Sequence, residues 1–239
     1  MKIEIIKCLE DNYSYLLIDE ESNSACVIDP SESKPIIDYT EKNKINLTFI
    51  LNTHHHFDHI GGNKDLKKKY NSKVIGFKKE KNRIPEIDIA LDDKEIWKNN
   101  KFEAKIYHIP GHTSGHVCYH FFNQNILFTG DTLFSLGCGR IFEGTYEEMF
   151  SSLQLIKSFP GDTKIYCGHE YTLKNSEFCI KHDENNPTLK EKIKLVKTNL
   201  EKGLPTIPTT IKEELECNIF LRSKDVQSFS KLRDLKDNF

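Results

Sequence analysis

The 239-residue sequence lacks the features of several specialised protein classes. No stretch approaches the roughly 18 consecutive apolar residues of a membrane-spanning helix. Twelve glycines and eight prolines are too few for a collagenous or low-complexity chain. Neither charge sign is in excess, because 34 Lys and Arg residues stand against 36 Asp and Glu residues, and a net charge of −2 gives no basic footprint for nucleic acid. We therefore expect a soluble globular protein with neither nucleic acid nor membrane among its partners.

Paired cysteines and a targeting segment are also missing. The seven cysteines are odd in number, scattered and never spaced CxxC, so we expect neither a disulfide framework nor a cysteine-rich zinc site. The first 20 residues, MKIEIIKCLEDNYSYLLIDE, alternate in polarity and carry charges every few positions, unlike a signal or transit peptide. These observations predict reduced thiols, a cytoplasmic location and a first strand close to the N-terminus.

Short β-rich runs dominate the first two thirds of the chain, and helical patterns dominate the rest. The predicted strands, rich in Ile, Val, Tyr and Phe, are residues 2–8, 13–19, 25–28, 47–52, 73–77, 102–109, 117–122, 126–129 and 163–167. The predicted helices are residues 34–43, 62–70, 146–159, 173–182, 189–202, 211–216 and the tail from 224. Lysine-rich stretches at 64–69 and 98–101 are interpreted as solvated surface. The pattern predicts a mixed α/β domain, 1–171, and a helical domain, 172–239.

Four of the ten histidines lie within six positions, in the segment THHHFDHIGG that directly follows an apolar strand. In an extended segment His54 and His56 point to the same side, so both can bind one metal ion. Asp58 and His59 follow where the chain turns toward a helix. Imidazoles with a carboxylate suit zinc, iron or manganese. An exposed polar loop would also hold histidines, but it does not explain their position between a strand end and Gly-Gly.

Three further segments place candidate ligands after strands. PGHTSGH contains His112, TGDT contains Asp131, and CGHEY contains His169. Ligands at the carboxyl ends of several strands are how a single active-site rim is assembled. Together the segments supply five histidines and two aspartates. That set is sufficient for two metal ions with a bridging carboxylate, an arrangement that can hold and deprotonate a water molecule.

The pattern H-x-H-x-D-H, followed by a Gly-His turn, Gly-Asp and Gly-His, resembles the metallo-β-lactamase superfamily. More narrowly, THHHFDHIGGN, PGHTSGH, GDTLF, GCGRIFEGT and CGHEYT resemble the glyoxalase II (hydroxyacylglutathione hydrolase) family. The N-terminal CLEDNYSYLL and the late NIFLR fit the same family, so the resemblance covers nearly the whole chain. It implies an α/β fold, the αββα metallo-β-lactamase sandwich, with a small C-terminal helical domain that binds substrate.

The resemblance also implies a role for particular residues of this chain. One divalent metal ion would be bound by His54, His56 and His112, and a second by Asp58, His59 and His169, with Asp131 bridging; zinc is the first expectation, with iron or manganese also accepted. Glutathione would be bound by Arg140, Tyr171, Arg222 and Lys224. The chain departs from the family in two places, since Arg140 stands where lysine is frequent and Phe142 stands where a tyrosine hydroxyl is frequent. Gly137 and Gly139 flank Cys138 in a turn that lets backbone approach a ligand.

The implied reaction is hydrolysis of S-D-lactoylglutathione to D-lactate and glutathione, the second step of methylglyoxal detoxification, by a monomer. A hydroxide bridging the two metal ions would attack the thioester carbonyl, and Asp58 would accept or orient its proton. The leaving thiolate has a conjugate-acid pKa near roughly 8.5, so no separate general acid is required.

Several alternatives are less well supported by the same residues. A glutathione persulfide dioxygenase with a single iron shares H-x-H-x-D-H, but the helical region and its FLR segment favour the hydrolase. A β-lactamase or nuclease would not need GCGR and GHEYT. A non-catalytic thiol- or metal-binding protein would not need Asp58. A thiolate nucleophile at Cys138 or Cys167 has no partner base, and His55 and His116 are assigned structural roles.

Overall fold

A computed structural model describes residues 1–99 and 102–239, so the last two residues of the 98–101 stretch lie outside the described residues. The chain divides into two compact units. Unit 1 comprises residues 1–108 and 115–123, and unit 2 comprises residues 109–114 and 124–239. The division between residues 171 and 172 that the composition suggests stays a prediction.

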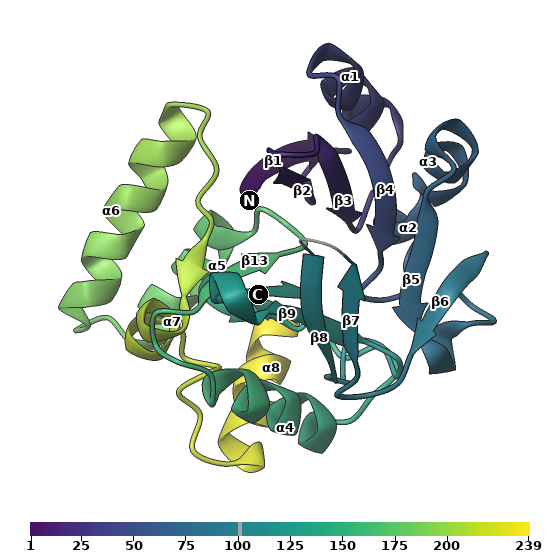
Figure 1. Cartoon of the computed structure of the whole chain (residues 1–239). Helices are drawn as coiled ribbons and strands as arrows, with labels where there is room; N and C mark the ends of the chain where they lie inside the picture. Colours follow the sequence, from purple (N-terminus) through teal and green to yellow (C-terminus); the bar gives the residue numbers. More distant parts are fainter. Residues whose placement is uncertain (100–101) are drawn as a thin grey trace. The chain divides into compact units, whose positions relative to one another are not determined.

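Unit 1 contains a six-stranded sheet whose strands follow one another in sequence order (Figure 1). The strands are β1 (Lys2–Cys8), β2 (Asn12–Asp19), β3 (Ser24–Ile28), β4 (Asn46–Leu51), β5 (Lys73–Phe77) and β6 (Ile87–Leu91). The first three pair antiparallel, and β3 to β6 pair parallel. Parallel pairing brings the carboxyl ends of β3 and β4 to one edge, where the amide of Asp29 bonds the Leu51 carbonyl at 2.9 Å.

Helices α1 (Lys34–Lys42) and α3 (Asn63–Tyr70) pack against this sheet, and α2 (Phe57–Ile60) is a single turn between β4 and α3. Their apolar residues join those of the sheet in one core, because burying both is the main favourable term in folding. The buried members of this core are Ile6, Cys8, Leu16, Ile18, Ala25, Val27, Ile36, Ile45, Leu47, Ile50, Leu66, Val74 and Ile84. Every residue of β2 is buried, as expected of a strand covered on both faces.

A second layer of strands in unit 1 consists of β7 (Ile96–Asn99), β8 (Phe102–His108) and β9 (Val117–Phe121), which pair antiparallel. Aromatic side chains join it to the first sheet. The Trp97 ring contacts Phe49 edge-on, with ring centroids 5.0 Å apart. The Tyr119 hydroxyl donates to the carbonyl of Asn52 at 2.9 Å. The end of β4, where the histidine segment begins, is therefore fixed between two layers.

Unit 2 contains the parallel strands β10 (Ile126–Gly130) and β13 (Lys164–Cys167), with β14 (Thr209–Thr210) antiparallel to β13. A small hairpin is formed by β11 (Leu133–Phe134) and β12 (Gly137–Cys138). The helices are α4 (Tyr146–Lys157), α5 (Thr172–His182), α6 (Pro187–Glu201), α7 (Ile211–Cys217) and α8 (Val226–Asp237). Capping boxes at Thr145 and Thr210 bind the first free amides of α4 and α7, which fixes where these helices begin.

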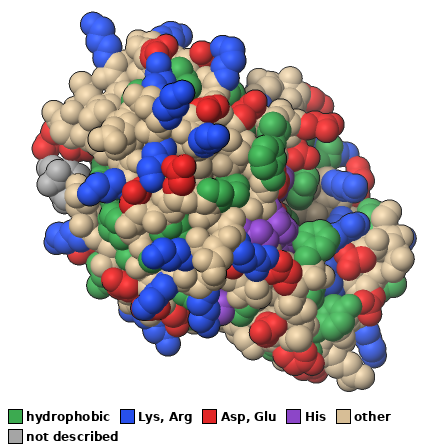
Figure 2. Space-filling view, turned by 90° about the vertical axis from the view of Figure 1, so that its right-hand side faces the viewer, with side chains coloured by type: hydrophobic (Ala, Val, Ile, Leu, Met, Phe, Trp, Pro, Cys, Tyr) green, Lys and Arg blue, Asp and Glu red, His purple; other side chains and the backbone are tan. Residues whose placement is uncertain are grey.

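The predicted strands and helices all form, with their ends within about two residues of the prediction. The predicted strands do not include β6, β7 or the two-residue strands β11, β12 and β14, and the last three are too short to show a periodicity. Among the described residues, no helix has the length and apolar character needed to cross a membrane. Acidic and basic side chains are interspersed on the face shown in Figure 2, as the balanced composition predicts.

Candidate metal centre

The histidine segment follows β4 and enters the single turn α2. His54 is fully buried, and its ring centroid lies 4.7 Å from that of His56 and 4.1 Å from that of His59. His56 has extended backbone angles, φ −58° and ψ 143°, and is the residue before α2. The rings of His54 and His56 therefore lie next to each other, as the hypothesis that both bind one metal ion requires.

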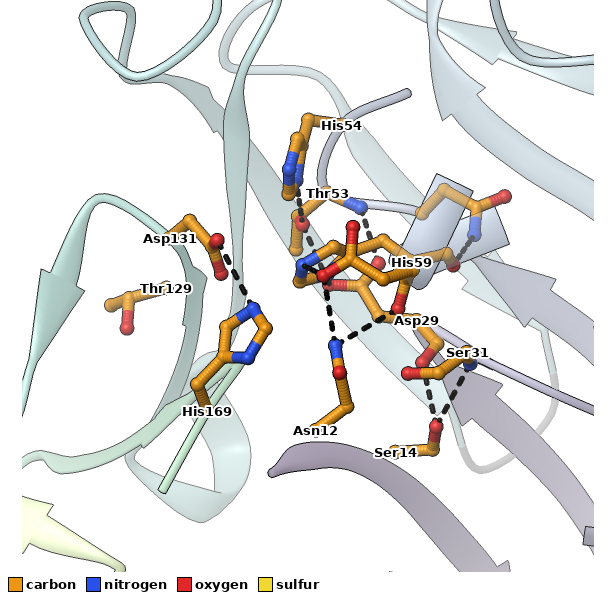
Figure 3. Close-up of polar contacts among 12 residues, drawn as sticks. Asn12, Ser14, Asp29, Ser31, Thr53, His54, His59, Thr129, Asp131 and His169 are labelled. Carbon is orange, nitrogen blue, oxygen red and sulfur yellow. Dashed lines mark hydrogen bonds and ion pairs between the residues drawn. The ribbon is translucent and has the colours of Figure 1, made fainter. Parts of the chain in front are cut away.

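Asp29, directly after β3, orients His59 (Figure 3). One carboxylate oxygen accepts the amide of Thr53 at 2.7 Å, and the other lies 2.6 Å from the Thr53 hydroxyl and 3.0 Å from His59 Nδ1. With Nδ1 held by a carboxylate, Nε2 is the nitrogen that can bind metal, and it lies 3.6 Å from Asp58 Oδ2. Asp29 is buried with His54 and His59 and could itself bind a metal ion, but its bonds to Thr53 and His59 favour an orienting role.

Asn12, at the start of β2 and labelled in Figure 3, orients Asp58. Its side-chain amide donates to the Asp58 carbonyl at 3.1 Å and to Asp58 Oδ2 at 3.0 Å. Neither Asn12 nor Asp29 was predicted from the sequence as a functional residue. The available signals were the position of Asn12 within CLEDNYSYLL and that of Asp29 between a strand and Pro30.

His55 makes contacts consistent with the structural role assigned to it. Its Nδ1 lies 2.8 Å from Oε2 of Glu80, a carboxylate that is 2% exposed, and its Nε2 bonds Arg83. Glu80 also fills the space beside Gly115, where a Cβ atom would meet Glu80 Oε1 at 1.9 Å. On the other side of the segment, His116 stacks on the His54 ring with centroids 4.6 Å apart. Both residues support the segment that carries the candidate ligands.

Replacing Glu80 by Ala is expected to lower the free energy of unfolding by about 3 kcal/mol, because it empties the space that the buried side chain fills beside Gly115 and removes the partner of His55 Nδ1. Urea denaturation measures this loss. Glu20→Ala, at an exposed position in unit 1, provides the control and should change the value by less than about 0.5 kcal/mol. Equal stability of the two variants would show that Glu80 does not support His55.

In unit 2, the imidazoles of His112 and His169 approach the carboxylate of a third candidate ligand, Asp131, which directly follows β10. Asp131 Oδ2 lies 3.5 Å from His112 Nε2 and 3.3 Å from His169 Nε2, and all three residues are buried (Figure 3 shows the pair with His169). His112 Nδ1 lies 2.9 Å from the carbonyl of Arg140, to which it can donate, so its Nε2 is directed at Asp131. One carboxylate oxygen faces two imidazole nitrogens, which is the position a bridging ligand requires.

The predicted glutathione-binding residues all lie in unit 2. The Tyr171 ring stacks on His169, with centroids 4.7 Å apart and planes 7° apart, and the Tyr171 backbone angles, φ −101° and ψ 3°, are not extended. The Arg140 side chain is 61% exposed, with Nε 3.5 Å from Asp237 Oδ1. Arg222 pairs with Asp183, and Lys224 is exposed.

Phe142 presents a largely exposed ring, 62% accessible, beside the candidate ligand His112. The two ring centroids are 5.2 Å apart, and the Phe142 amide bonds the His112 carbonyl at 3.2 Å. An apolar ring therefore stands where the family frequently supplies a hydroxyl.

The thiols beside these ligands are not activated. Burial raises the pKa of Cys167 to about 12. Burial also raises the pKa of Cys138, although the nearby Arg233 opposes the shift. A thiol with a raised pKa is protonated near neutral pH, so neither cysteine has the character of a catalytic nucleophile.

The donor set in each unit fits divalent metal ions. The imidazoles of His54, His59, His112 and His169 are buried and that of His56 is half-buried. Those of His59 and His112 have Nδ1 held by an oxygen, the arrangement that directs Nε2 to a metal. Carboxylates stand within 3.6 Å of three of the Nε2 atoms. Imidazole with carboxylate is a combination that zinc, iron and manganese accept.

Comparison with known proteins gives matches over nearly the whole chain. Residues 10–169 match the model of the metallo-beta-lactamase superfamily, and residues 170–239 match that of the hydroxyacylglutathione hydrolase C-terminus. The chain is 66% identical over 239 residues to the hydroxyacylglutathione hydrolase of Pelagibacter ubique, with 100% of both chains covered. It is 45% identical over 234 residues to the hydroxyacylglutathione hydrolase of Prochlorococcus marinus, covering 97% of this chain and 94% of the relative.

Two solved structures show the same fold at lower identity. ETHE1 from Myxococcus xanthus superposes with a TM-score of 0.75 and 22% identity, covering 98% of this chain and 90% of that one. The B3 metallo-beta-lactamase BLEG-1 superposes with a TM-score of 0.73 and 22% identity, covering 93% and 100%. The fold expected from the sequence, the metallo-β-lactamase fold followed by a helical C-terminal region, is confirmed.

Proposed function

This chain belongs to the hydroxyacylglutathione hydrolase family of the metallo-β-lactamase superfamily, and we propose that it cleaves S-D-lactoylglutathione to D-lactate and glutathione. Membership makes the chain a hydrolase whose fold binds divalent metal ions. The observation that carries the specific substrate is the match of residues 170–239 to a C-terminal region particular to this family.

We assign the metal ligands as the family resemblance indicates. His54, His56 and His112 would bind one ion and Asp58, His59 and His169 the other, with Asp131 shared. The orientation of His59 by Asp29, and of His112 by the Arg140 carbonyl, supports this assignment. Zinc is proposed first, and iron or manganese would also suit these ligands. When bound, the ions would supply a hydroxide near neutral pH and polarise the thioester carbonyl.

Asp58 would accept or orient the proton of the attacking water. Its Oδ2 is fixed by the Asn12 amide at 3.0 Å, so its direction is set before substrate arrives. The departing glutathione thiolate is stable enough to leave without a proton donor, since a free thiol has a pKa near roughly 8.5.

Arg140, Tyr171, Arg222 and Lys224 would bind the glutathione part of the substrate. Both arginines already face a carboxylate, Asp237 for Arg140 and Asp183 for Arg222. On binding, the glutathione carboxylates would take the places of Asp237 and Asp183 beside these arginines, so one ion pair replaces another. The net gain should therefore be modest for each arginine.

Arg222→Ala is expected to raise KM for S-D-lactoylglutathione about tenfold while kcat changes less than about twofold, because an interaction worth roughly 1.4 kcal/mol holds the ground and transition states alike. Steady-state kinetics on the metal-replete protein measures both constants. Lys34→Ala, an exposed cation paired with Asp38 on α1, is the matched control and should leave both unchanged. A fall in kcat with unchanged KM would contradict the proposed role.

The assignment of the reaction is tested by the unaltered protein. We expect turnover of S-D-lactoylglutathione by protein carrying two metal ions per chain. Absence of hydrolysis by such a protein would contradict the proposal. Oxygen uptake with glutathione persulfide would then test the dioxygenase alternative.

We further propose that the protein acts in the cytoplasm as a monomer. Its seven cysteines are buried and none forms a disulfide, which suits a reducing compartment.

A further inference from the structure

The hairpin β11–β12 is held by side chains from the C-terminal part of unit 2. Five consecutive backbone carbonyls, from Phe134 to Cys138, each accept a hydrogen bond from such a side chain. Asn218 Nδ2 donates to Phe134 at 3.4 Å and to Gly137 at 3.1 Å, Asn175 Nδ2 to Ser135 at 3.1 Å, Cys179 Sγ to Leu136 at 3.1 Å, and Arg233 Nη1 to Cys138 at 2.8 Å.

A buried carboxylate completes this arrangement. Glu214, which is fully buried, accepts the Leu136 amide at 2.8 Å and the Asn218 side-chain amide at 2.9 Å. Leu136 has φ +59°, a conformation that costs energy for a residue other than glycine. We call Asn175, Cys179, Glu214, Asn218 and Arg233 the carbonyl cradle. Because the hairpin is buried, its backbone groups would be unsatisfied without these partners.

The residues that follow the hairpin β11–β12 in sequence contact a candidate metal ligand. The Gly139 amide bonds the Thr132 carbonyl at 3.2 Å, beside Asp131. One residue later, the Arg140 carbonyl faces His112 Nδ1 at 2.9 Å. The position of that carbonyl decides which way the His112 ring turns. The cradle residues touch no candidate ligand themselves, but they fix the segment that orients one.

We propose that Asn218 and Arg233 are positioning residues for the metal centre: by holding the carbonyls of Phe134, Gly137 and Cys138 they place the Arg140 carbonyl, which directs His112 Nε2 toward Asp131. This proposal rests on the proposed function, because it takes His112 and Asp131 as metal ligands. It gives the C-terminal region a second role besides substrate binding. Metal affinity therefore depends on residues far along the sequence from every ligand in the H-x-H-x-D-H segment.

Zinc affinity, measured by competition with a chromophoric chelator, tests the proposal without using activity. Asn218→Ala is expected to weaken the binding of one zinc ion by about 10- to 100-fold, the range typical of losing a group that orients a ligand. The absorption spectrum of the cobalt-loaded protein should also change, because it reports the geometry of the ligands. Asn186→Ala is the matched control, since Asn186 bonds Asp183 and the Glu216 carbonyl in the same unit but does not touch the hairpin.

A second pair of variants keeps the test decisive if Asn218→Ala does not fold. Arg233→Met retains the bulk of the side chain and loses the bond to Cys138, whereas Arg233→Lys retains a donor. We expect the Met variant to bind zinc more weakly and the Lys variant to recover part of the affinity. Folded variants that all bind zinc within about twofold of the unaltered protein would overturn the positioning role.

The outcome for the unaltered protein separates this proposal from the proposed function. Tight binding of two zinc ions without thioester hydrolysis would overturn the proposed function alone, because the positioning role of the carbonyl cradle is tested by zinc affinity and not by activity. Failure of the unaltered protein to bind zinc, iron or manganese would overturn both.

Discussion

Asp131→Asn is expected to lower kcat/KM for S-D-lactoylglutathione by about a thousandfold or more, corresponding to roughly 4 kcal/mol of lost transition-state stabilisation. The Oδ2 atom of Asp131 lies 3.5 Å from His112 Nε2 and 3.3 Å from His169 Nε2. An amide in its place has no negative charge and its nitrogen cannot bind a metal ion, so it could not bridge the ion proposed at His112 and the ion proposed at His169. The variant should therefore lose metal as well as activity, and metal analysis of the purified protein should show less than two ions per chain.

Asp19→Asn is the matched control for this loss. Asp19 is also a buried aspartate, but it lies at the end of β2 opposite to Asn12, where it accepts a hydrogen bond from the Ser22 hydroxyl. Its replacement should leave metal content intact and kcat/KM within about twofold. If Asp131→Asn retained two metal ions and full turnover, Asp131 could not be the shared ligand.

The candidate ligands could be predicted from the sequence because each lies in a short motif. His54, His56, Asp58 and His59 are neighbours in the chain, so periodicity and the end of β4 decide where they point. Gly-His and Gly-Asp after the other strands identify His112, Asp131 and His169 in the same way. The strands could be predicted for a similar reason, since their apolar runs are continuous and bounded by turn residues.

The groups that orient these ligands could not be predicted from spacing. Asn12 reaches Asp58 across 46 positions of sequence, and Asp29 reaches Thr53 across 24. Only the pairing of β2, β3 and β4 brings them together, and side-chain periodicity does not report pairing. The same applies to Arg222, whose partner Asp183 is 39 positions away. Local chemistry was visible in the sequence, whereas chemistry that depends on tertiary contacts was not.

Gly139→Ala is expected to lower kcat/KM by at least about a hundredfold, or roughly 2.7 kcal/mol. The sequence suggested that this glycine provides a flexible turn. The structure gives a different reason, because a Cβ atom at Gly139 would lie 1.9 Å from the Asp131 carbonyl and 3.2 Å from His112 Nδ1. No real Cβ contact is as short as 1.9 Å, so the backbone of the candidate ligand Asp131 or of the Gly139 segment must move.

That displacement is expected to disturb the metal centre more than the stability of the fold. Overpacking costs about 1–3 kcal/mol of stability, so the Gly139→Ala protein should still fold at room temperature and its zinc affinity can be measured. Gly161→Ala is the matched control, since its nearest neighbour would be Lys212 Cβ at 3.5 Å, an ordinary contact. It should keep full activity and metal. Because the added methyl group is the same in both variants, a selective loss at Gly139 locates the effect at the Asp131 backbone and the His112 ring. Equal activity of the two variants would show that the Asp131 backbone can shift without disturbing the candidate ligands.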